Sequence, residues 1–248
     1  MGQGLASAIH TTNHVLLYDT GPKYSPSFTA GRAIIVPYLR YRGNDRVDII
    51  VQSHGDNDHI GGLNDVMDNI EIGKILTSVP SKTVFSNVEY CRDGQSWVWD
   101  EVRFEMLHPA EIGKFHGNNA SCVLRVSHGT HSILMTGDIE AKAERALLSM
   151  HEHEISSSML IVPHHGSRTS STAALVRAVS PEYVVFSSRY LNRFGFPKQD
   201  IITRYEEIGA RLLNTADSGA ISMQVRSRGI SITRQREKSR KFWNTRAE

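Results

Sequence analysis

The sequence predicts an α/β fold in which two β-sheets are sandwiched between helices. Two observations lead to this prediction. Short apolar runs closed by turn residues follow one another through the first half of the chain, and strand-like and helix-like segments alternate in the second half. The chain has 248 residues, of which 40% are hydrophobic and 22% charged, as in an ordinary globular protein that buries a sizeable core. No linker, low-complexity segment or repeat of fixed period divides it.

The first half reads as a series of strands. The segment Arg32–Gly43 is ambiguous, because Pro37 argues against a long regular element there. A helix is expected over Ile60–Ile70, beginning just after His59. Strands are expected at His14–Gly21, Val47–His54, Lys74–Pro80, Ser96–Pro109, Ser121–Gly129 and His131–Asp138.

The second half alternates. Glu140–Met150 is rich in Ala, Leu and Glu, which favours a helix. Further helices are expected at Ser170–Ala178 and Asp200–Ile208. Buried strands are expected at Ser158–Gly166 and Tyr183–Ser188, and a closing hairpin turns around Gly229.

Charge is unevenly distributed along the chain. The segment from residue 226 to the end holds eight Lys or Arg and two Glu, so it carries +6, while the rest carries −4 of the total +2. We expect residues 1–225 to form the domain, and residues 226–248 to form a last strand and a basic C-terminal tail. Such a tail indicates contact with an anionic polymer or a membrane surface, and the alternative is a solvated tail.

Several absences bound the class of protein. No apolar run reaches the roughly 18 residues of a membrane-spanning helix, and no segment reads as a signal peptide. The chain begins as folded protein, which suggests excision from something longer. Cys91 and Cys122 belong to no C-x-x-C pair and are expected to be two small buried hydrophobic residues, with the redox compartment left open.

Polar side chains gather where three of the expected strands end. Because strand ends can meet at one edge of an α/β fold, imidazole and carboxylate groups distant in sequence can converge there. They are too many for one tetrahedral site and suit two bridged metal ions. The candidate ligands are His54, Asp56, Asp58, His59, Asp138, His164 and His165.

Each cluster also has a reading without metal. Asp138 alone is more often a turn residue, and the loop from His54 to His59 can be a helix cap. One of His164 and His165 can lie in the core and the other on the surface. The Gly61-Gly62 pair allows a close backbone approach after the first cluster.

The motifs "YDTG", "SHGDNDHIGG", "MTGD" and "PHHGS" resemble those of the metallo-β-lactamase superfamily. The fold implied is an αββα sandwich of two mixed β-sheets flanked by helices. "GQGLASAI", "VPYLRYRG", "NNASCVLRV", "PHHGSRTSS" and "NTADSGAI" also resemble the C-terminal domain of ComEC-type DNA-internalisation competence proteins. The resemblance covers most of the chain and implies that Asp19 supports the metal site without binding metal.

The same resemblance implies a function and a location. It implies a nuclease domain that degrades the non-transported DNA strand during natural transformation. It also implies a full-length protein of the bacterial inner membrane, with this soluble domain on the periplasmic side. The expected partners are single-stranded DNA and the membrane-embedded channel of the same protein, with no organic cofactor.

The sequence departs from these families at two places. Where lactamases carry a third-motif histidine, the segment Gly117–Val123 offers only Asn118, Asn119 and Ser121. Where the ComEC pattern carries a histidine before a proline, this chain has Phe196.

The expected chemistry is hydrolysis of a phosphodiester by metal-activated water, with Asp58, His59 and Asp56 as the catalytic residues. Either Asp58 or Asp56 can receive the proton. Three carboxylates in the site favour two Mn²⁺ ions, although the imidazoles also suit Zn²⁺. The alternatives are a small-molecule lactone or ester hydrolase and a catalytically degenerate DNA-guiding module.

Polar residues around the rim are expected to position the substrate. A further group with charge and aromatic rings, Arg189, Tyr190, Arg193 and Phe194, can contact a single strand. For each of these residues the alternative is an ordinary surface role. The expected substrate-binding residues are Asn119, Ser121, Ser167, Arg168, Thr169 and Asn192.

Overall fold

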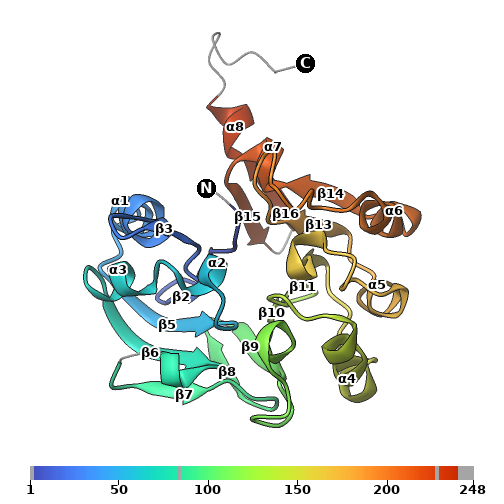
Figure 1. Ribbon diagram of the computed structural model, residues 1–248, viewed down its shortest axis with the longest axis horizontal. Helices are drawn as coiled ribbons and strands as arrows, with labels where there is room; N and C mark the ends of the chain where they lie inside the picture. Colours follow the sequence, from blue (N-terminus) through green and yellow to red (C-terminus); the bar gives the residue numbers. More distant parts are fainter. Residues whose placement is uncertain (1–2, 83–84, 227–228, 240–248) are drawn as a thin grey trace.

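The computed structural model describes residues 3–82, 85–226 and 229–239. Two β-sheets face each other, and helices cover their outer faces (Figure 1). The expected αββα sandwich of two mixed sheets is therefore confirmed.

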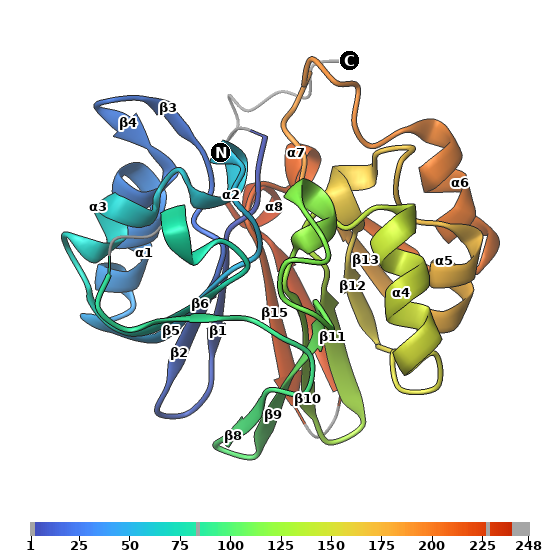
Figure 2. The same cartoon turned by 60° about the horizontal axis from the view of Figure 1, so that its bottom comes forward.

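The first sheet has five strands in the order β1-β2-β5-β6-β7. The β1–β2 pair is antiparallel and the other pairs are parallel. The helices α1 (Val36–Tyr41) and α3 (Leu63–Met67) lie on its outer side, with the π-helical segment η1 (Gly31–Ile35) before α1 (Figure 2). The strands are β1 (Ser7–His10), β2 (Val15–Tyr18), β5 (Arg46–Gln52), β6 (Glu71–Thr77) and β7 (Val88–Tyr90).

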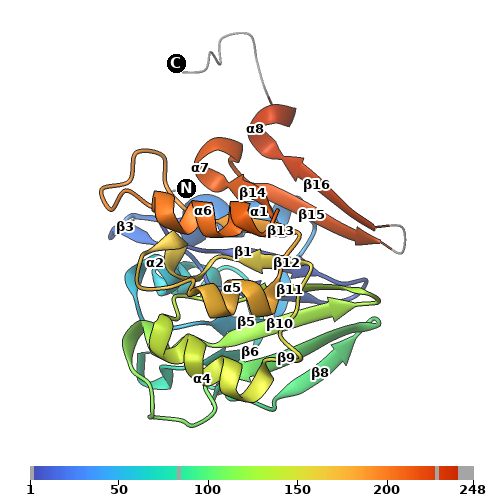
Figure 3. The same cartoon turned by 90° about the vertical axis from the view of Figure 1, so that its right-hand side faces the viewer.

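The second sheet has seven strands in the order β14-β13-β12-β11-β10-β9-β8. Pairs from β11 to β14 are parallel, and those from β8 to β11 are antiparallel. The strands are β8 (Ser96–Trp99), β9 (Val102–His108), β10 (Val123–His128), β11 (His131–Met135), β12 (Met159–Ile161), β13 (Tyr183–Phe186) and β14 (Arg211–Asn214). Figure 3 shows the covering helices α4 (Ala141–His151), α5 (Ala173–Val179) and α6 (Gln199–Glu207).

Short elements complete the described chain. The hairpin β3 (Lys23–Ser25)–β4 (Phe28–Thr29) projects beside α2 (Asn57–Ile60). The remaining elements are the hairpin β15 (Ile221–Arg226)–β16 (Gly229–Arg234), the helices α7 (Thr215–Ser218) and α8 (Gln235–Lys238), and the 3₁₀ turns η2 (Pro80–Lys82), η3 (Gly117–Ala120) and η4 (Pro163–Gly166).

Central strands are apolar on both faces because both faces are covered. In β2, Leu16 and Tyr18 point into the core between the sheets, whereas Leu17 points to the core under α1 and α3. Val184 and Val185 of β13 divide in the same way between the outer and inner cores. This explains why these segments read as continuous apolar runs rather than as alternating strands.

Three expected elements differ from the structure, and one ambiguous segment is settled by it. The strand expected over Ser158–Gly166 is β12 only as far as Ile161, and Pro163–Gly166 form the turn η4. The helix expected over Ile60–Ile70 is two short helices, α2 and α3, and His59 lies inside α2 rather than before it. Gly61 and Gly62 separate the two helices. The backbone packs so closely at this point that a Cβ on Gly62 would lie 2.3 Å from the carbonyl oxygen of Thr20, so only glycine fits there. The ambiguous segment around Pro37 is helical, since proline is tolerated in a first turn.

The strand expected over Ser96–Pro109 is in fact the hairpin β8–β9, with Asp100 and Glu101 in left-handed conformations at its turn. The sequence carries no sign of this turn, because neither Asp100 nor Glu101 is a glycine or a proline.

The expectation of two unpaired cysteines is wrong. Cys91 and Cys122 form a disulfide with a Cα–Cα distance of 5.9 Å. Both residues are fully buried in the core between the sheets. The pairing depends on tertiary proximity, which spacing along the chain does not reveal.

The C-terminal hairpin packs on the inter-sheet core through Ile221, Met223, Ile230 and Ile232. The expected boundary between residues 225 and 226 falls at the end of β15, and residues 240–248 of the expected tail lie outside the described residues. The division into domain and tail stays a prediction. Across the described chain, no helix has both the length and the apolar character needed to span a bilayer.

Candidate metal centre

The candidate site lies where strands of both sheets end. Ser53 and His54 follow β5 of the first sheet, whereas Asp138 follows β11 and His165 follows β12 of the second. The helix α2, which carries Asp58 and His59, lies at this end of the sandwich (Figure 2). The clusters expected at one sheet edge therefore converge from two sheets.

Four side chains form the centre. One ligand atom from each of Asp58, His59, Asp138 and His165 lies within 4.8 Å of all the others. Nε2 of His59 lies 3.1 Å from Oδ1 of Asp138. Nε2 of His165 lies 3.3 Å from Asp58 Oδ2 and 3.5 Å from Asp138 Oδ2. The spacing is that of a site holding one divalent cation.

The buried imidazoles support this reading. His54, His59 and His165 are almost fully buried, and Nε2 of each faces a carboxylate without forming a well-aligned hydrogen bond to it. Because an unsatisfied buried polar atom is costly, three such atoms at one place favour a bound cation between the imidazoles and the carboxylates. Imidazole nitrogens together with carboxylate oxygens suit Zn²⁺ or Mn²⁺.

Residues around the centre orient His59. Nδ1 of His59 lies 2.7 Å from Oδ2 of Asp19, which also accepts a hydrogen bond of 2.8 Å from the Ser53 hydroxyl. The Ser53 backbone N–H donates to Asp19 Oδ1 at 2.7 Å. Asp19 is fully buried and thus turns Nε2 of His59 towards Asp138.

Burial and neighbouring charge shift the pKa values of His59 and Asp138 in opposite directions. Burial alone would lower the pKa of His59, but the Asp138 and Asp19 carboxylates outweigh it and raise that pKa well above its usual value. Burial alone would raise the pKa of Asp138, whereas the neighbouring histidines hold it well below the usual range. The site therefore concentrates negative charge where a cation would bind.

The backbone before Asp138 needs glycine. Gly137 has φ +54°, and a Cβ there would lie 2.8 Å from the Cβ of Ser121 and 2.9 Å from that of Ser53. The hydroxyl of Ser121 accepts a hydrogen bond of 3.0 Å from the Asp138 backbone N–H. The motif "MTGD" is therefore a tight turn that fixes the Asp138 carboxylate.

His54 and Asp56 lie beside the centre. Nε2 of His54 lies 3.7 Å from Asp56 Oδ2, and the His54 and His59 rings are 4.3 Å apart. The Asp56 side chain is 59% exposed. These two residues are therefore placed for a second, more open cation site, which stays a prediction.

The two adjacent histidines point differently. Both have left-handed backbones, with φ of 48° at His164 and 55° at His165. His165 joins the centre, whereas Nδ1 of His164 lies 3.1 Å from Thr169 Oγ1 and 3.4 Å from Glu140 Oε1. Nε2 of His164 is still only 3.9 Å from Asp138 Oδ2. His165 is thus the better placed ligand.

The side chains predicted to contact substrate make contacts within the protein. Oδ1 of Asn119 accepts hydrogen bonds from the backbone N–H groups of Glu140 and Ala143, and Nδ2 donates to Glu140. It thereby caps the start of α4. Ser121 is fully buried, and its hydroxyl positions Asp138 through the hydrogen bond described above. Contact of either with substrate stays a prediction.

The other four residues lie on the loops around the centre. Ser167 and Thr169 share a hydroxyl contact of 3.0 Å, and exposed Arg168 pairs with Asp200 at 3.0 Å. The amide of Asn192 bonds both the N–H and the carbonyl of Phe196. All four give shape to the rim, and their role in substrate binding also stays a prediction.

Sequence reasoning missed three polar residues. Ser53 directly precedes His54, and Glu140 lies two residues after Asp138. This closeness to predicted ligands is the signal in the sequence that could have identified both. Buried Glu144 accepts hydrogen bonds from the backbone N–H groups of Ser171 and Thr172, and burial raises its pKa. It anchors the loop that carries His164 and His165 to α4.

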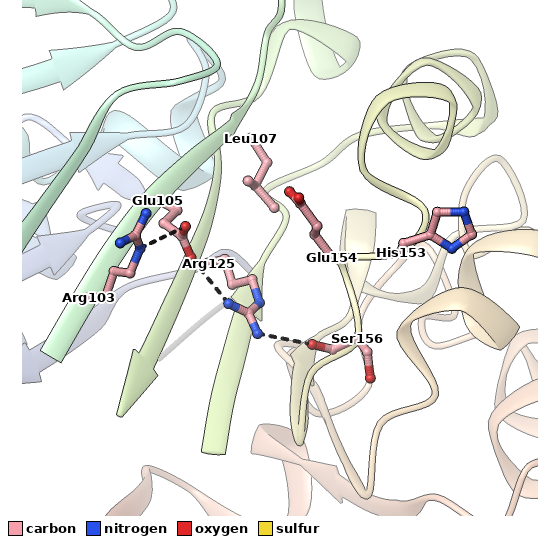
Figure 4. A pocket seen from close by; sticks show the side chains of 7 residues that line it. All are labelled: Arg103, Glu105, Leu107, Arg125, His153, Glu154 and Ser156. Atoms are coloured by element: carbon pink, nitrogen blue, oxygen red, sulfur yellow. Dashed lines mark hydrogen bonds and ion pairs between the residues drawn. The ribbon is translucent and has the colours of Figure 1, made fainter. Parts of the chain in front are cut away.

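A separate surface cavity of about 470 Å³ lies between β9, β10 and the segment after α4 (Figure 4). None of the candidate ligands lines it. Arg125 spans it, with ion pairing to Glu105 and a hydrogen bond to the Ser156 carbonyl. Its lining residues are Arg103, Glu105, Leu107, Arg125, His153, Glu154 and Ser156.

Known proteins resemble the chain at the levels of family, sequence and fold. The metallo-beta-lactamase superfamily matches residues 1–188. The chain is 38% identical to competence protein ComA of Neisseria gonorrhoeae, over 95% of this chain and 33% of that protein. It is 32% identical to recombination protein 2 of Haemophilus influenzae, over 96% of this chain and 30% of that protein. The chain therefore spans about a third of these curated relatives.

The metallo-beta-lactamase fold protein YhfI from Bacillus subtilis has a similar structure, with a TM-score of 0.56 at 11% identity. The match covers 86% of this chain and 88% of that one. At this identity the likeness concerns the fold alone.

Proposed function

Because the chain belongs to the metallo-β-lactamase superfamily, we propose that it is a metal-dependent phosphodiesterase that cleaves DNA. Its substrate in this proposal is the strand that is not transported during natural transformation. Relatives named competence protein and recombination protein support a role in DNA handling. Since the chain spans about a third of those relatives, it would act as one domain of a larger membrane protein with a DNA channel.

The observation that carries the proposal is the set of three buried imidazole Nε2 atoms that face carboxylates without well-aligned hydrogen bonds, at a cluster that includes Asp58 and Asp138. Bound cations would lower the pKa of water and neutralise charge on a phosphodiester. Asp58, His59, Asp138 and His165 would hold one ion, and His54 with Asp56 a second. The three carboxylates favour Mn²⁺ over Zn²⁺.

The remaining roles follow from position. Asp58 lies at the centre with an exposed edge, 32% accessible, so it is placed to accept the proton of the attacking water. Asp56 is the alternative acceptor. Asp19 and Ser53 hold His59 in orientation, and Ser121 holds Asp138.

The disulfide bears on location. Disulfides persist in oxidising compartments and are rare where thiols are kept reduced. The buried Cys91–Cys122 bond therefore supports the periplasmic side of the inner membrane for this domain.

The test is incubation of the purified chain with labelled single- and double-stranded DNA across Mn²⁺, Mg²⁺ and Zn²⁺. Asp58→Ala should abolish cleavage, because metal binding and proton acceptance are lost together. Asp68→Ala, at an exposed carboxylate that ends α3, is the matched control and should cleave like the wild type. Cleavage by Asp58→Ala at the wild-type rate would refute the mechanism.

A second candidate function is a DNA-guiding module without catalysis. Phe196 favours it, because this residue packs edge-on to His164 at 5.9 Å in place of a histidine. Metal content separates the two proposals. A purified chain that binds no divalent ion and cleaves no DNA, yet binds DNA, would favour the guiding module.

A further inference from the structure

Two pairs of partly exposed aromatic rings stand beside the metal centre. The first lies on the β3–β4 hairpin, where Tyr24 and Phe28 are 5.3 Å apart and 44% and 54% exposed. The Asn57 side chain donates a hydrogen bond of 2.9 Å to the Lys23 carbonyl, which fastens this hairpin to α2. Asn57 lies between Asp56 and Asp58, so the ring pair is anchored at the metal loop itself.

The second pair lies on the loop between β13 and α6. The rings of Phe194 and Phe196 stack at 5.4 Å with an angle of 17° between their planes. Phe196 also contacts the ring of His164, the neighbour of His165, at 5.9 Å. Asn192 bonds both backbone groups of Phe196, which gives this loop a defined shape.

Positive charge accompanies both pairs. The Arg193 guanidinium lies 4.8 Å from the centre of the Phe194 ring, and the Lys198 ammonium 5.6 Å from that of Phe196. Lys23 is exposed on the hairpin that carries Tyr24. Tyr24, Phe28 and Phe194 are 44–54% exposed, and Phe196 is half-buried. Rings this accessible beside cations are unsuited to a purely apolar partner, and they fit a ligand with flat faces and negative charge.

The views agree on the arrangement. Figures 2 and 3 place the hairpin, the loop between β13 and α6, and α2 at the same end of the sandwich. In Figure 2 the hairpin and the loop rise from opposite halves, with α2 between them. A chain that crosses this end from the hairpin to the loop would pass over α2, which carries Asp58 and His59.

We propose that the Tyr24–Phe28 and Phe194–Phe196 pairs are stacking platforms that hold unpaired bases of a single-stranded nucleic acid on either side of the metal centre. This inference rests on the proposed phosphodiesterase function and names its substrate as a strand with free base faces. Bases paired in a duplex cannot offer these faces, whereas every base of a single strand can. The backbone between two held bases then lies over Asp58 and Asp138.

The test combines removal of rings from the protein with removal of bases from the ligand. Wild-type protein should bind a short oligothymidylate about tenfold more tightly than a strand of equal length with abasic residues. Phe28→Ala/Phe194→Ala should lose most of this preference, while Phe28→Tyr/Phe194→Tyr should keep it. Because both phenylalanines are about half exposed, the alanine variant should fold, as circular dichroism would check.

Tyr41→Ala is the matched control. Tyr41 is 89% exposed at the end of α1, ahead of the start of β5 and so at the opposite end of that strand from the metal loop. Its loss should leave the preference for bases unchanged. An equal preference in wild type and the alanine double variant, or equally tight binding of duplex and single strand, would overturn the proposal.

Hydrolysis of bis(4-nitrophenyl) phosphate, a phosphodiester without bases, tests the underlying function separately. Hydrolysis by wild type without any preference for bases refutes the platforms and leaves the phosphodiesterase. A preference for bases without hydrolysis supports the platforms and refutes the phosphodiesterase.

Discussion

Asp19 controls the candidate centre without contacting the place where a cation would bind. Its carboxylate engages Ser53 twice and His59 once, and all three residues are fully buried. A carboxylate that accepts from Nδ1 of a histidine fixes the tautomer in which Nε2 is free to bind metal. The orientation of the His59 ring is therefore determined by Asp19, which directly follows β2 and is distant from His59 in the sequence.

Replacing the charge at this position tests that role. Asp19 has φ +59°, a conformation that asparagine tolerates well, so Asp19→Asn changes charge and acceptor capacity with little backbone strain. We expect affinity for Mn²⁺ to fall about 10- to 100-fold, measured by calorimetric titration. Asp68→Asn, at an exposed site, is the control, and equal affinities in all three proteins would contradict the role of Asp19.

The residues that the structure brings together at the candidate centre were predictable from the sequence to the extent that they follow strands. The dense polar runs after two apolar segments contain Asp58 and His59 as well as His165, and their binding of metal stays a prediction. The choice between His164 and His165 was not predictable, because two successive left-handed residues send neighbouring side chains in different directions. Only the folded backbone decides which of them meets Asp138.

At the scale of elements, one carboxylate ties the two sheets together. Asp100, at the β8–β9 turn, accepts hydrogen bonds from the Thr11 hydroxyl at 2.6 Å and from the Asn13 backbone N–H at 2.8 Å. Both donors belong to the β1–β2 turn of the other sheet. These hydrogen bonds, that from Thr11 foremost, hold the pKa of Asp100 well below its usual range.

The sign of the resulting pH dependence follows from that lowered pKa. The ionised Asp100 stabilises the fold at pH values above its unfolded pKa of about 3.9, and this contribution is lost as the pH falls. Asp100→Asn should therefore be less stable than wild type at pH 7, and the difference should shrink towards pH 3. Urea unfolding at both pH values measures it, and a constant difference would show that the charge is not responsible.

The disulfide joins the segment after β7 to the segment before β10. Its sequence separation is 31 residues, so the cross-link removes about 4 kcal/mol of unfolded-state entropy in the chain-entropy account. Cys91→Ala/Cys122→Ala should unfold roughly 10 °C below the oxidised wild type. Reductant should lower the melting temperature of the wild type but not that of the double variant, which has no disulfide to reduce. If the double variant and the oxidised wild type melted at the same temperature, the disulfide would not be stabilising.

Elements buried on both faces were predictable, and edge elements were not. The apolar runs of β2, β5 and β13 identified these strands because each face packs on a core. The short β3 and β7, with exposed positions, carry little apolar signal. The disulfide escaped prediction because its partners meet only when the sheets have assembled.

For the whole molecule, charge is separated between the body and the C-terminal segment. The described part of that segment is held to the body, since Arg236 donates a hydrogen bond to the Ala216 carbonyl. Arg234 forms an ion pair with Glu237 within the segment. Arg226 and Lys238 are exposed on the same segment. The segment therefore presents positive charge from a fixed position next to α7.

Salt dependence tests whether this charge meets DNA. Changing Arg234, Arg236, Arg240 and Lys241 to glutamine should flatten the slope of log K against log salt for a single strand by up to about 3, because each phosphate contact contributes about 0.7 through counterion release. The matched control changes Arg40, Arg42, Arg145 and Arg177, which lie exposed on or beside the outer helices. That control removes the same net charge, so a flattening confined to the first variant places the strand along the C-terminal segment. Equal slopes in wild type and the first variant would leave the segment as a solvated tail, and equal flattening in both variants would assign the effect to net charge alone.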